Sequence, residues 1–272
     1  MANPEQLRDA ALWPNWDLPD PQPGHPFKLP RHDGFCLGAF AGMPDVTVFV
    51  KDLSADVDRL VAEARALVVA RGARTGAWMI PEASRPSGLG DVLTAEYGMT
   101  PYDELPHEPR FAALLLTTSP PAPDSPGLVT RPAESLAEFE AAALVGMDSF
   151  EVSEQNRDAH RAHSRKLWNF EVAGDSGYRT FVGLLDGEIV GTAAAIFGAN
   201  AVYLVGGSTR ADARGRGVYR ALVRARWDAA VARGTPALTV SAGRMSRPIL
   251  ESLGFAHAGW IDVLRDDLDS FT

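Results

Sequence analysis

A short loop rich in glycine and arginine constrains the fold of this chain more than any other feature. Residues 207–221 read GSTRADARGRGVYRA. An apolar run predicts a strand over residues 201–205, just before this stretch, and an amphipathic pattern predicts a long helix over residues 218–233 after it. A strand, a glycine-containing turn and an immediate helix start are typical of α/β folds that bind an anion at the first turn of the helix.

The loop has the residues that a pyrophosphate group needs. Gly215 and Gly217 allow backbone N–H groups to approach phosphate oxygens without interference from a Cβ atom. Arg214 and Arg216 can add charge-assisted hydrogen bonds. The dipole of the following helix contributes about 0.3–1 kcal/mol to binding an exposed anion and up to ~2 kcal/mol for a partly buried one. The alternative is that the glycines only turn the chain and the arginines are solvated.

Two other phosphate-binding loops are excluded at this place. The Rossmann fingerprint requires a third glycine, and Arg220 occupies its position. The P-loop requires Gly-Lys followed by Ser or Thr, which the sequence lacks.

The second half of the chain has a regular order of predicted elements around the loop. Besides the strand and helix that flank it, the patterns predict, in chain order, helices over 136–145 and 153–168, strands over 178–185 and 188–197, a strand over 237–241, a short helix over 248–253 and a last strand over 259–264. Asp186-Gly187 joins the first two strands as a hairpin, because both residues tolerate positive φ.

The loop and this order of elements resemble the GCN5-related N-acetyltransferase (GNAT) superfamily. Residues 214–219 resemble its Arg/Gln-x-x-Gly-x-Gly/Ala signature, and Leu253-Gly254-Phe255 resembles the Leu-Gly-Phe that ends its short helix. The resemblance covers residues 127–272 and implies an α/β (α+β) fold with a mixed, mostly antiparallel central sheet flanked by helices.

The resemblance also implies a site for acetyl-CoA as the acyl donor. Its pantetheine arm would pair with the backbone of Gly207, Ser208 and Thr209. Its pyrophosphate would lie on the backbone of six residues, Arg214, Gly215, Arg216, Gly217, Val218 and Tyr219. The reaction implied is direct attack of a neutral amine on the thioester, with both substrates held in a ternary complex.

The sequence departs from the family pattern at three positions. Tyr219 stands where the signature prefers Gly or Ala. Leu250 stands where many members carry a tyrosine that protonates the departing thiolate, and Gly243 stands where an asparagine is usual. The usual general acid is therefore missing.

Three residues are candidates for the missing acid–base groups. Tyr203, on the strand before the loop, and Ser246, at the start of the short helix, could act as acids; the alternatives are a sheet residue and an N-cap. Glu171 could act as a base, because neighbouring aromatic residues (WNFE, residues 168–171) could desolvate it and raise its pKa. The alternative is a surface glutamate closing a helix, and Trp168 and Phe170 are either pocket or core residues.

Metal binding is not expected. Cys36 is the single cysteine, which excludes an intrachain disulfide and a cysteine-based zinc cluster. His160 and His163 lie three residues apart on one face of a polar helix, but the sequence offers no third ligand. We interpret them as solvated or as part of the rim of a substrate site.

The first half of the chain is expected to be a smaller, related domain. Its patterns predict strands over 46–50, 77–80 and 111–116 and helices over 56–70 and 89–97. Ala-Arg-Gly at residues 70–72 recurs at 232–234, and Ser-Arg-Pro at 84–86 recurs at 246–248. With the shared element order, these matches suggest a degenerate acetyltransferase-like copy without a cofactor loop, which would close one side of the acceptor site.

Proline-rich segments suggest the domain boundaries. We predict an N-terminal domain over residues 1–116, a linker over 117–127 (TSPPAPDSPG within it) and the acetyltransferase domain over 128–272. Residues 18–30 are also rich in proline and are expected to form an extended arm.

Net charge and hydropathy limit the kinds of partner that the protein can bind. The net charge of −9 and the pI of about 5.2 argue against nucleic acid, because polyphosphate binding needs a basic face. The N-terminus lacks the pattern of a signal peptide, and no apolar run approaches the ~20 residues that span a bilayer. We therefore expect a cytoplasmic protein that does not bind membranes and that could form a homodimer.

The leading hypothesis is an acyl-CoA-dependent N-acyltransferase that acts on the amine of a small molecule or peptide. A non-catalytic CoA-binding or regulatory module is the alternative, supported by Leu250 and Gly243. An aminoacyl-transfer enzyme on a tandem scaffold would need a basic face for RNA, which the net charge opposes.

Overall fold

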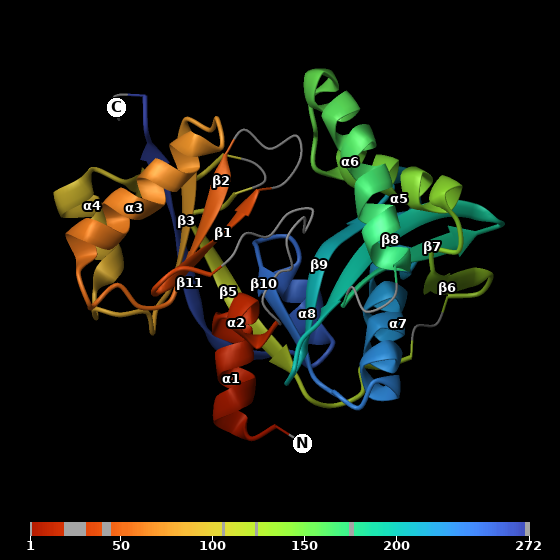
Figure 1. Cartoon of the computed structure of the whole chain (residues 1–272). Coiled ribbons are helices and arrows are strands. Elements are labelled where there is room, and N and C mark those ends of the chain that lie inside the picture. The colour runs from red at the N-terminus through yellow and green to blue at the C-terminus, as the bar shows by residue number, and fades with distance from the viewer. Residues whose placement is uncertain are drawn as a thin grey trace.

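A single eleven-stranded sheet runs through both halves of the protein in this computed structural model, which describes residues 2–18, 31–39, 45–104, 107–122, 125–173 and 177–269. The strand order is β1-β2-β3-β11-β5-β10-β9-β8-β7-β6, and β4 pairs with β11 (Figure 1). The strands are β1 Phe35–Ala39, β2 Val46–Val50, β3 Thr75–Pro81, β4 Thr100–Pro101, β5 Arg110–Leu116, β6 Leu128–Pro132, β7 Tyr178–Leu185, β8 Glu188–Phe197, β9 Val202–Thr209, β10 Leu238–Ala242 and β11 Ala256–Asp267.

Helices cover both faces of this sheet. They are α1 Pro4–Leu12, α2 Pro14–Asp17, α3 Val57–Ala70, α4 Leu89–Tyr97, α5 Leu136–Ser149, α6 Glu154–Val172, α7 Val218–Ala232 and α8 Arg247–Ser252. Among the described residues, none of these helices combines the length and the apolarity that crossing a bilayer requires.

The expected sheet is confirmed, because all neighbouring strands are antiparallel except two pairs. Those two parallel pairs are β2 with β3 and β9 with β10. Each belongs to the same series of elements, strand, helix, strand and short helix, as β2-α3-β3-α4 and as β9-α7-β10-α8. This repetition supports a degenerate N-terminal copy of the second half.

The two halves are joined by an exchange of strands. β5, from the first half, lies between β10 and β11 of the second half. β11 in turn continues beside β3, so that in Figure 1 the indigo C-terminal strand lies among the orange and yellow strands. The division into residues 1–116, 117–127 and 128–272 stays a prediction, since a shared sheet does not by itself define domains.

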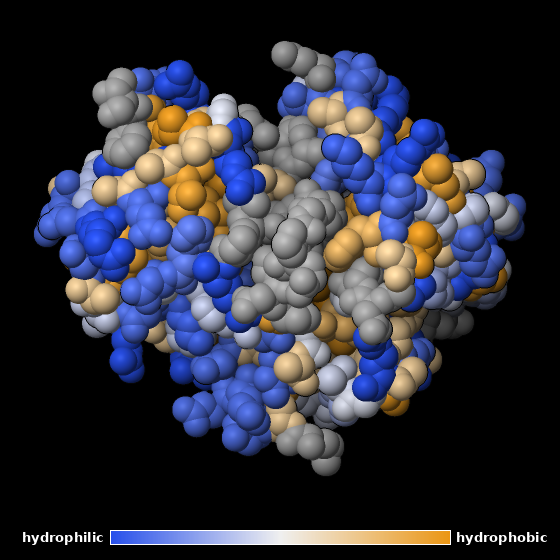
Figure 2. Space-filling model, viewed as in Figure 1, coloured by the Kyte–Doolittle hydropathy of each residue, from blue (hydrophilic) through white to orange (hydrophobic). Residues whose placement is uncertain are grey.

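Each half has its own apolar core. The larger core lies between α7, α8 and strands β5, β7, β8, β9 and β10. The other core lies between α3, α4 and strands β1, β2 and β3, with Leu264 of β11. Between the N-terminal half and α6 the surface is hollowed (Figure 2).

Several elements differ from the predictions. α1, α2 and β1 were not predicted, and the arm expected over residues 18–30 lies outside the described residues except for Leu18. The strand predicted over 201–205 continues to Thr209, because Gly206 and Gly207 form a bulge instead of ending it. The last strand begins at Ala256 and ends at Asp267. The predicted linker packs on α7, where Arg224 Nη1 donates to the Pro120 carbonyl at 3.2 Å.

The packing of α7 on the sheet depends on a glycine in β8. A Cβ atom on Gly191 would collide with Val218 Cγ1 and lie 3.1 Å from Leu222 Cδ1. We expect Gly191→Ala to lower the free energy of unfolding by about 1–3 kcal/mol, because overpacking forces the helix outward. Gly146→Ala in α5 is the control; its Cβ would meet only Thr192 Cγ2 at 3.9 Å, so a gain of about 0.5–1 kcal/mol is expected. Urea unfolding of both variants checks that the first change lowers the free energy of unfolding and the second raises it.

Candidate functional site

Strands β9 and β10 pair only at their amino ends. The paired positions are Val202 with Leu238 and Tyr203 with Thr239. β9 nevertheless continues to Thr209 and β10 to Ala242, so the strands part toward their carboxyl ends. The corresponding parallel strands of the first half, β2 and β3, stay paired at four positions, 46–49 with 76–79. Within the described residues, β9 continues for six residues beyond its last pair with β10, whereas β2 continues for one residue beyond its last pair with β3. This longer unpaired stretch leaves backbone groups of β9 open on the side of β10.

A bulge lies on this open part of β9. Val205 is opposite Ala194 and Ser208 is opposite Thr192, so β9 has one residue more than β8 between these pairs. Gly206 adopts a φ of +60° in the bulge, which a residue with a side chain would adopt only under strain. The bulge turns the backbone of the following residues relative to the rest of the strand.

The loop after β9 leads to a helix start that has no cap. Gly217 is the N-cap residue of α7, with a φ of +78°, and among the described residues no side chain accepts a hydrogen bond from the first turn. In the first half the equivalent helix α3 is capped by Asp56, whose Oδ1 accepts from the Arg59 N–H at 3.0 Å. Because uncapped N–H groups attract an anion and a carboxylate cap repels one, α7 is open to a phosphate and its equivalent α3 is not.

Buried hydroxyl groups near the loop also lack partners. Among the described residues, no group forms a hydrogen bond with the buried Oγ of Ser208 or Oγ1 of Thr209. Both follow the bulge on the open part of β9. Open backbone, unused hydroxyls and an uncapped helix together fit the pantetheine arm and pyrophosphate of a CoA thioester. Ser125, from the end of the predicted linker, borders this site, since a Cβ on Gly217 would collide with its Oγ.

The structure explains the departures at Leu250 and Gly243. Leu250 is fully buried in the larger core, so no proton donor reaches the site from α8 at this position. At Gly243 a Cβ would collide with Glu108, whose carboxylate accepts from the Arg244 N–H at 2.8 Å. Glu108 thus lies at the carboxyl end of β10. Its role could not be predicted, because it comes from the first half and no local pattern marks it.

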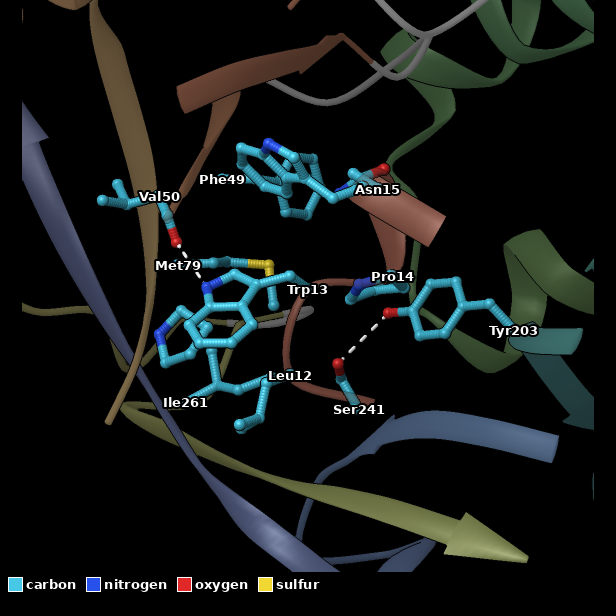
Figure 3. Close-up of a pocket in the computed structure, with 12 residues that line it drawn as sticks. Leu12, Trp13, Pro14, Asn15, Phe49, Val50, Met79, Tyr203, Ser241 and Ile261 are labelled. Atoms are coloured by element: carbon cyan, nitrogen blue, oxygen red, sulfur yellow. Dashed lines mark hydrogen bonds between the residues drawn. The ribbon is translucent and has the colours of Figure 1, made fainter. Parts of the chain in front are cut away.

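Tyr203 lies where β9 and β10 part, at the edge of a crevice between the two halves. Its hydroxyl donates to Ser241 Oγ at 3.2 Å, and burial raises its pKa (Figure 3). The opposite wall comes from the first half and is apolar, with Trp13, Pro14 and Met79 among its residues. These side chains fill most of the crevice and leave a cavity of only about 10 Å³, about the room that one water molecule needs.

The other two candidates lie on different elements from Tyr203. Ser246 begins α8, which packs through Leu250 into the core shared with α7; it forms no side-chain cap bond there. Glu171 lies at the outer edge of β7, where its Oε1 accepts from the Thr180 N–H at 2.9 Å. Strands β7 and β8 therefore separate Glu171 from β9. The roles of all three as acid or base stay predictions.

The environment of Glu171 makes stability depend on pH. Its side chain is 1% exposed, and burial raises its pKa, against the opposing effect of the Thr180 hydrogen bonds and of Arg179. A pKa raised by folding gives stability that is complete below the unfolded value of 4.5 and is lost as pH rises through the folded value.

We therefore expect Glu171→Gln to be more stable than the wild type at pH 8, by about 1 kcal/mol, because a neutral amide is cheaper to bury and still accepts from Thr180. The difference should shrink at pH 5. Urea unfolding at both pH values measures it, with Glu154→Gln at the exposed start of α6 as the control. A difference that stays constant with pH would show that Glu171 is not the titrating group.

The remaining aromatic and histidine candidates have structural surroundings. The Trp168 ring lies 5.7 Å from that of Phe139, in the core under α5 and α6. Burial lowers the pKa of both His160 and His163, so they are not fully solvated as one interpretation had it. In the described part of the chain, no third ligand groups with them.

Comparisons with known proteins agree with this geometry. Residues 141–255 match the model of the acetyltransferase (GNAT) family. A search of curated proteins gave no match.

Solved structures share the fold over most of the chain. A GCN5-related N-acetyltransferase from Kribbella flavida is 18% identical, covers 88% of each chain and has a TM-score of 0.61. One from Sphaerobacter thermophilus is 17% identical over 86% of this chain and 77% of its own, also with a TM-score of 0.61. A tandem GNAT protein from the clavulanic acid biosynthesis pathway is 16% identical over 97% and 95% of the two chains, with a TM-score of 0.59. The open strand, the loop and α7 all lie within residues 141–255, the segment that matches the acetyltransferase (GNAT) family.

Proposed function

We propose that the chain is an acyl-CoA-dependent N-acyltransferase that moves the acetyl group of acetyl-CoA to the amine of a small molecule or peptide. One observation carries the proposal. Of two equivalent strand–helix units, only the second has parted strands and an uncapped helix start. This is the difference expected between a unit that binds a CoA thioester and one that only supports the fold.

Each part of the site has a task in this proposal. The backbone of Gly207, Ser208 and Thr209 would pair with the pantetheine arm, and residues 214–219 would hold the pyrophosphate, aided by the guanidinium groups of Arg214 and Arg216. The amine would approach from the side of Tyr203 and Ser241, where the first half forms the opposite wall. Holding the amine and the thioester in contact can supply roughly 7–11 kcal/mol of the barrier.

A second function is favoured by two positions. Leu250 is buried, and Glu108 covers Gly243, so the two polar groups usual in the family are replaced by a core residue and by a carboxylate in an ion pair with Arg244. These positions favour a CoA-binding module without turnover. Binding without product would distinguish this alternative.

The test combines binding and turnover on the full chain. Acetyl-CoA is titrated into the protein by calorimetry, and release of the free thiol is then followed with a panel of small amines and short peptides. Binding with amine-dependent thiol release supports the acyltransferase. Binding without release by any amine supports the module, and absence of binding to acetyl-CoA and to longer acyl-CoAs contradicts both. A cytoplasmic location and a homodimer are proposed on the sequence alone.

A further inference from the structure

The N-terminal segment covers one face of the sheet at the point where β9 and β10 part. Val202, Leu204 and Val240 belong to the core under α7. Because side chains alternate along a strand, Tyr203 and Ser241 point to the opposite face. There they meet a crevice whose other walls come from residues 12–16 and from strands β2, β3 and β11 (Figure 3).

This second face is the one from which an acceptor can reach the thioester. In the proposed function the pyrophosphate lies at the uncapped start of α7, so the CoA arm enters the gap between β9 and β10 from the side of that helix. The arm then occupies the α7 side of the gap. An amine that attacks the carbonyl carbon has to come from the other face, past Tyr203 and Ser241.

The N-terminal segment is held firmly at this crevice. Trp13 Nε1 donates to the Val50 carbonyl at 3.2 Å, and the Lys51 ammonium lies 5.2 Å from the centre of the Trp13 ring. At the end of α2, Asp17 Oδ1 accepts from Asn200 Nδ2 at 2.6 Å and from the Asn200 backbone N–H at 3.1 Å. The segment is therefore bonded to both halves of the protein, so that it forms a fixed wall.

The wall leaves no space for a bulky group. The cavity of about 10 Å³ has room for one water molecule. Pro14 lies beside the Tyr203 hydroxyl, and Trp13 and Met79 fill the side of the first half (Figure 3). Among the described residues that line the crevice, none carries a charged side chain. An ammonium ion would be buried there without a partner, so the amine has to enter in its neutral form.

We propose that Trp13, Pro14 and Met79 form a wall that limits the acceptor to a slim amine, one with no bulky group on the carbon that bears the reacting nitrogen. The inference rests on the proposed acyltransferase function and adds the shape of its acceptor. The second half would hold the donor, and the N-terminal segment with the first half would select the acceptor. This selection needs no second cofactor loop, so a degenerate copy can perform it.

The first test measures the wall without acyl-CoA or amine. In Trp13→Ala the loss of the indole should leave an apolar cavity, and such cavities bind benzene. Benzene should therefore shift the NMR signals of the Ile261 and Met79 methyl groups in this variant and not in the wild type. Leu93→Ala is the matched control, because Leu93 is fully buried in the other core and does not line the crevice.

In Leu93→Ala, benzene should leave the Ile261 signal in place. If benzene does not shift Ile261 in folded Trp13→Ala, the neighbouring side chains close the space, and Trp13 does not set the size limit. If Trp13→Ala does not fold, Met79→Ala takes its place with Ile261 as the reporter, because Met79 is only partly buried.

The second test compares an amine that the wild type accepts with the same amine carrying a phenyl group on the carbon next to its nitrogen. The ratio of kcat/KM for the bulky amine to that for the slim one should rise at least about tenfold in Trp13→Ala and in Met79→Ala, and change less than about threefold in Leu93→Ala. The Kd for acetyl-CoA should stay as in the wild type. An unchanged ratio in every folded variant of the wall overturns this inference alone. A wild type that releases no thiol with any amine overturns it together with the proposed function.

Discussion

Acetyl-CoA binding should be lost when Gly217 is replaced by glutamate together with Arg214→Ala. The change acts on both features that make the loop an anion site. A side chain at a φ of +78° is strained and would collide with Ser125 Oγ, and the carboxylate adds a negative charge at the start of α7. Arg214→Ala removes a charge-assisted donor. We expect the Kd for acetyl-CoA to rise at least about a hundredfold, which corresponds to roughly 2.7 kcal/mol of binding free energy. Calorimetric titration of both proteins measures this change.

The matched control for this variant is at the equivalent helix of the first half. Asp56→Ala removes the cap of α3 and should cost about 1 kcal/mol of stability without changing acetyl-CoA affinity. Arg214→Ala alone should raise Kd about tenfold, because one charge-assisted bond is lost and the fold is untouched. If the double variant binds as tightly as the wild type, the pyrophosphate does not lie on this loop, whatever the protein does with CoA.

Local patterns predicted the elements that carry the candidate site. Asp186-Gly187 and the alternation around it gave the bounds of β7 and β8, and the glycine of the loop marked the start of α7 at Val218. Turn and capping preferences depend on only a few neighbouring residues, so these elements can be predicted from the sequence alone. The start of α1 could also have been predicted from the sequence, because Asn3 and Gln6 form a capping box and Pro4 occupies the first helical position. The prolines that follow in the sequence favoured an irregular segment instead.

The remaining features depend on contacts between distant residues. Nothing local places β5 between β10 and β11, or Glu108 over Gly243. Arg226 belongs to an arginine-rich helix that also contains the exposed Arg220 and the half-buried Arg224, and only the fold makes Arg226 a buried charge. Tyr219 could be marked as a departure from the family signature, but its contact with Gly207 required the geometry of the bulge.

One ion pair connects the C-terminal strand to the N-terminal half, and its loss should lower the free energy of unfolding by as much as the loop variants lower the free energy of binding. Arg65 of α3 and Asp266 of β11 form a bidentate pair, with Nε to Oδ2 and Nη2 to Oδ1 both at 2.9 Å. The side chains are 18% and 2% exposed. Arg65 Nη2 also donates to the Tyr97 carbonyl at 2.9 Å, at the end of α4. One guanidinium thus joins the C-terminal strand to two helices of the N-terminal half.

Arg65→Ala should lower the free energy of unfolding by about 3–5 kcal/mol, because it leaves the Asp266 carboxylate buried without its cation. Arg59→Ala, on the same helix, is the control: its pair with Glu63 is half exposed, so a loss under about 1 kcal/mol is expected. Urea unfolding followed by tryptophan fluorescence in both halves measures the effect. A single transition shifted as a whole means that β11 makes the two halves one cooperative unit. An early transition confined to one half would mean that they unfold separately despite the shared sheet.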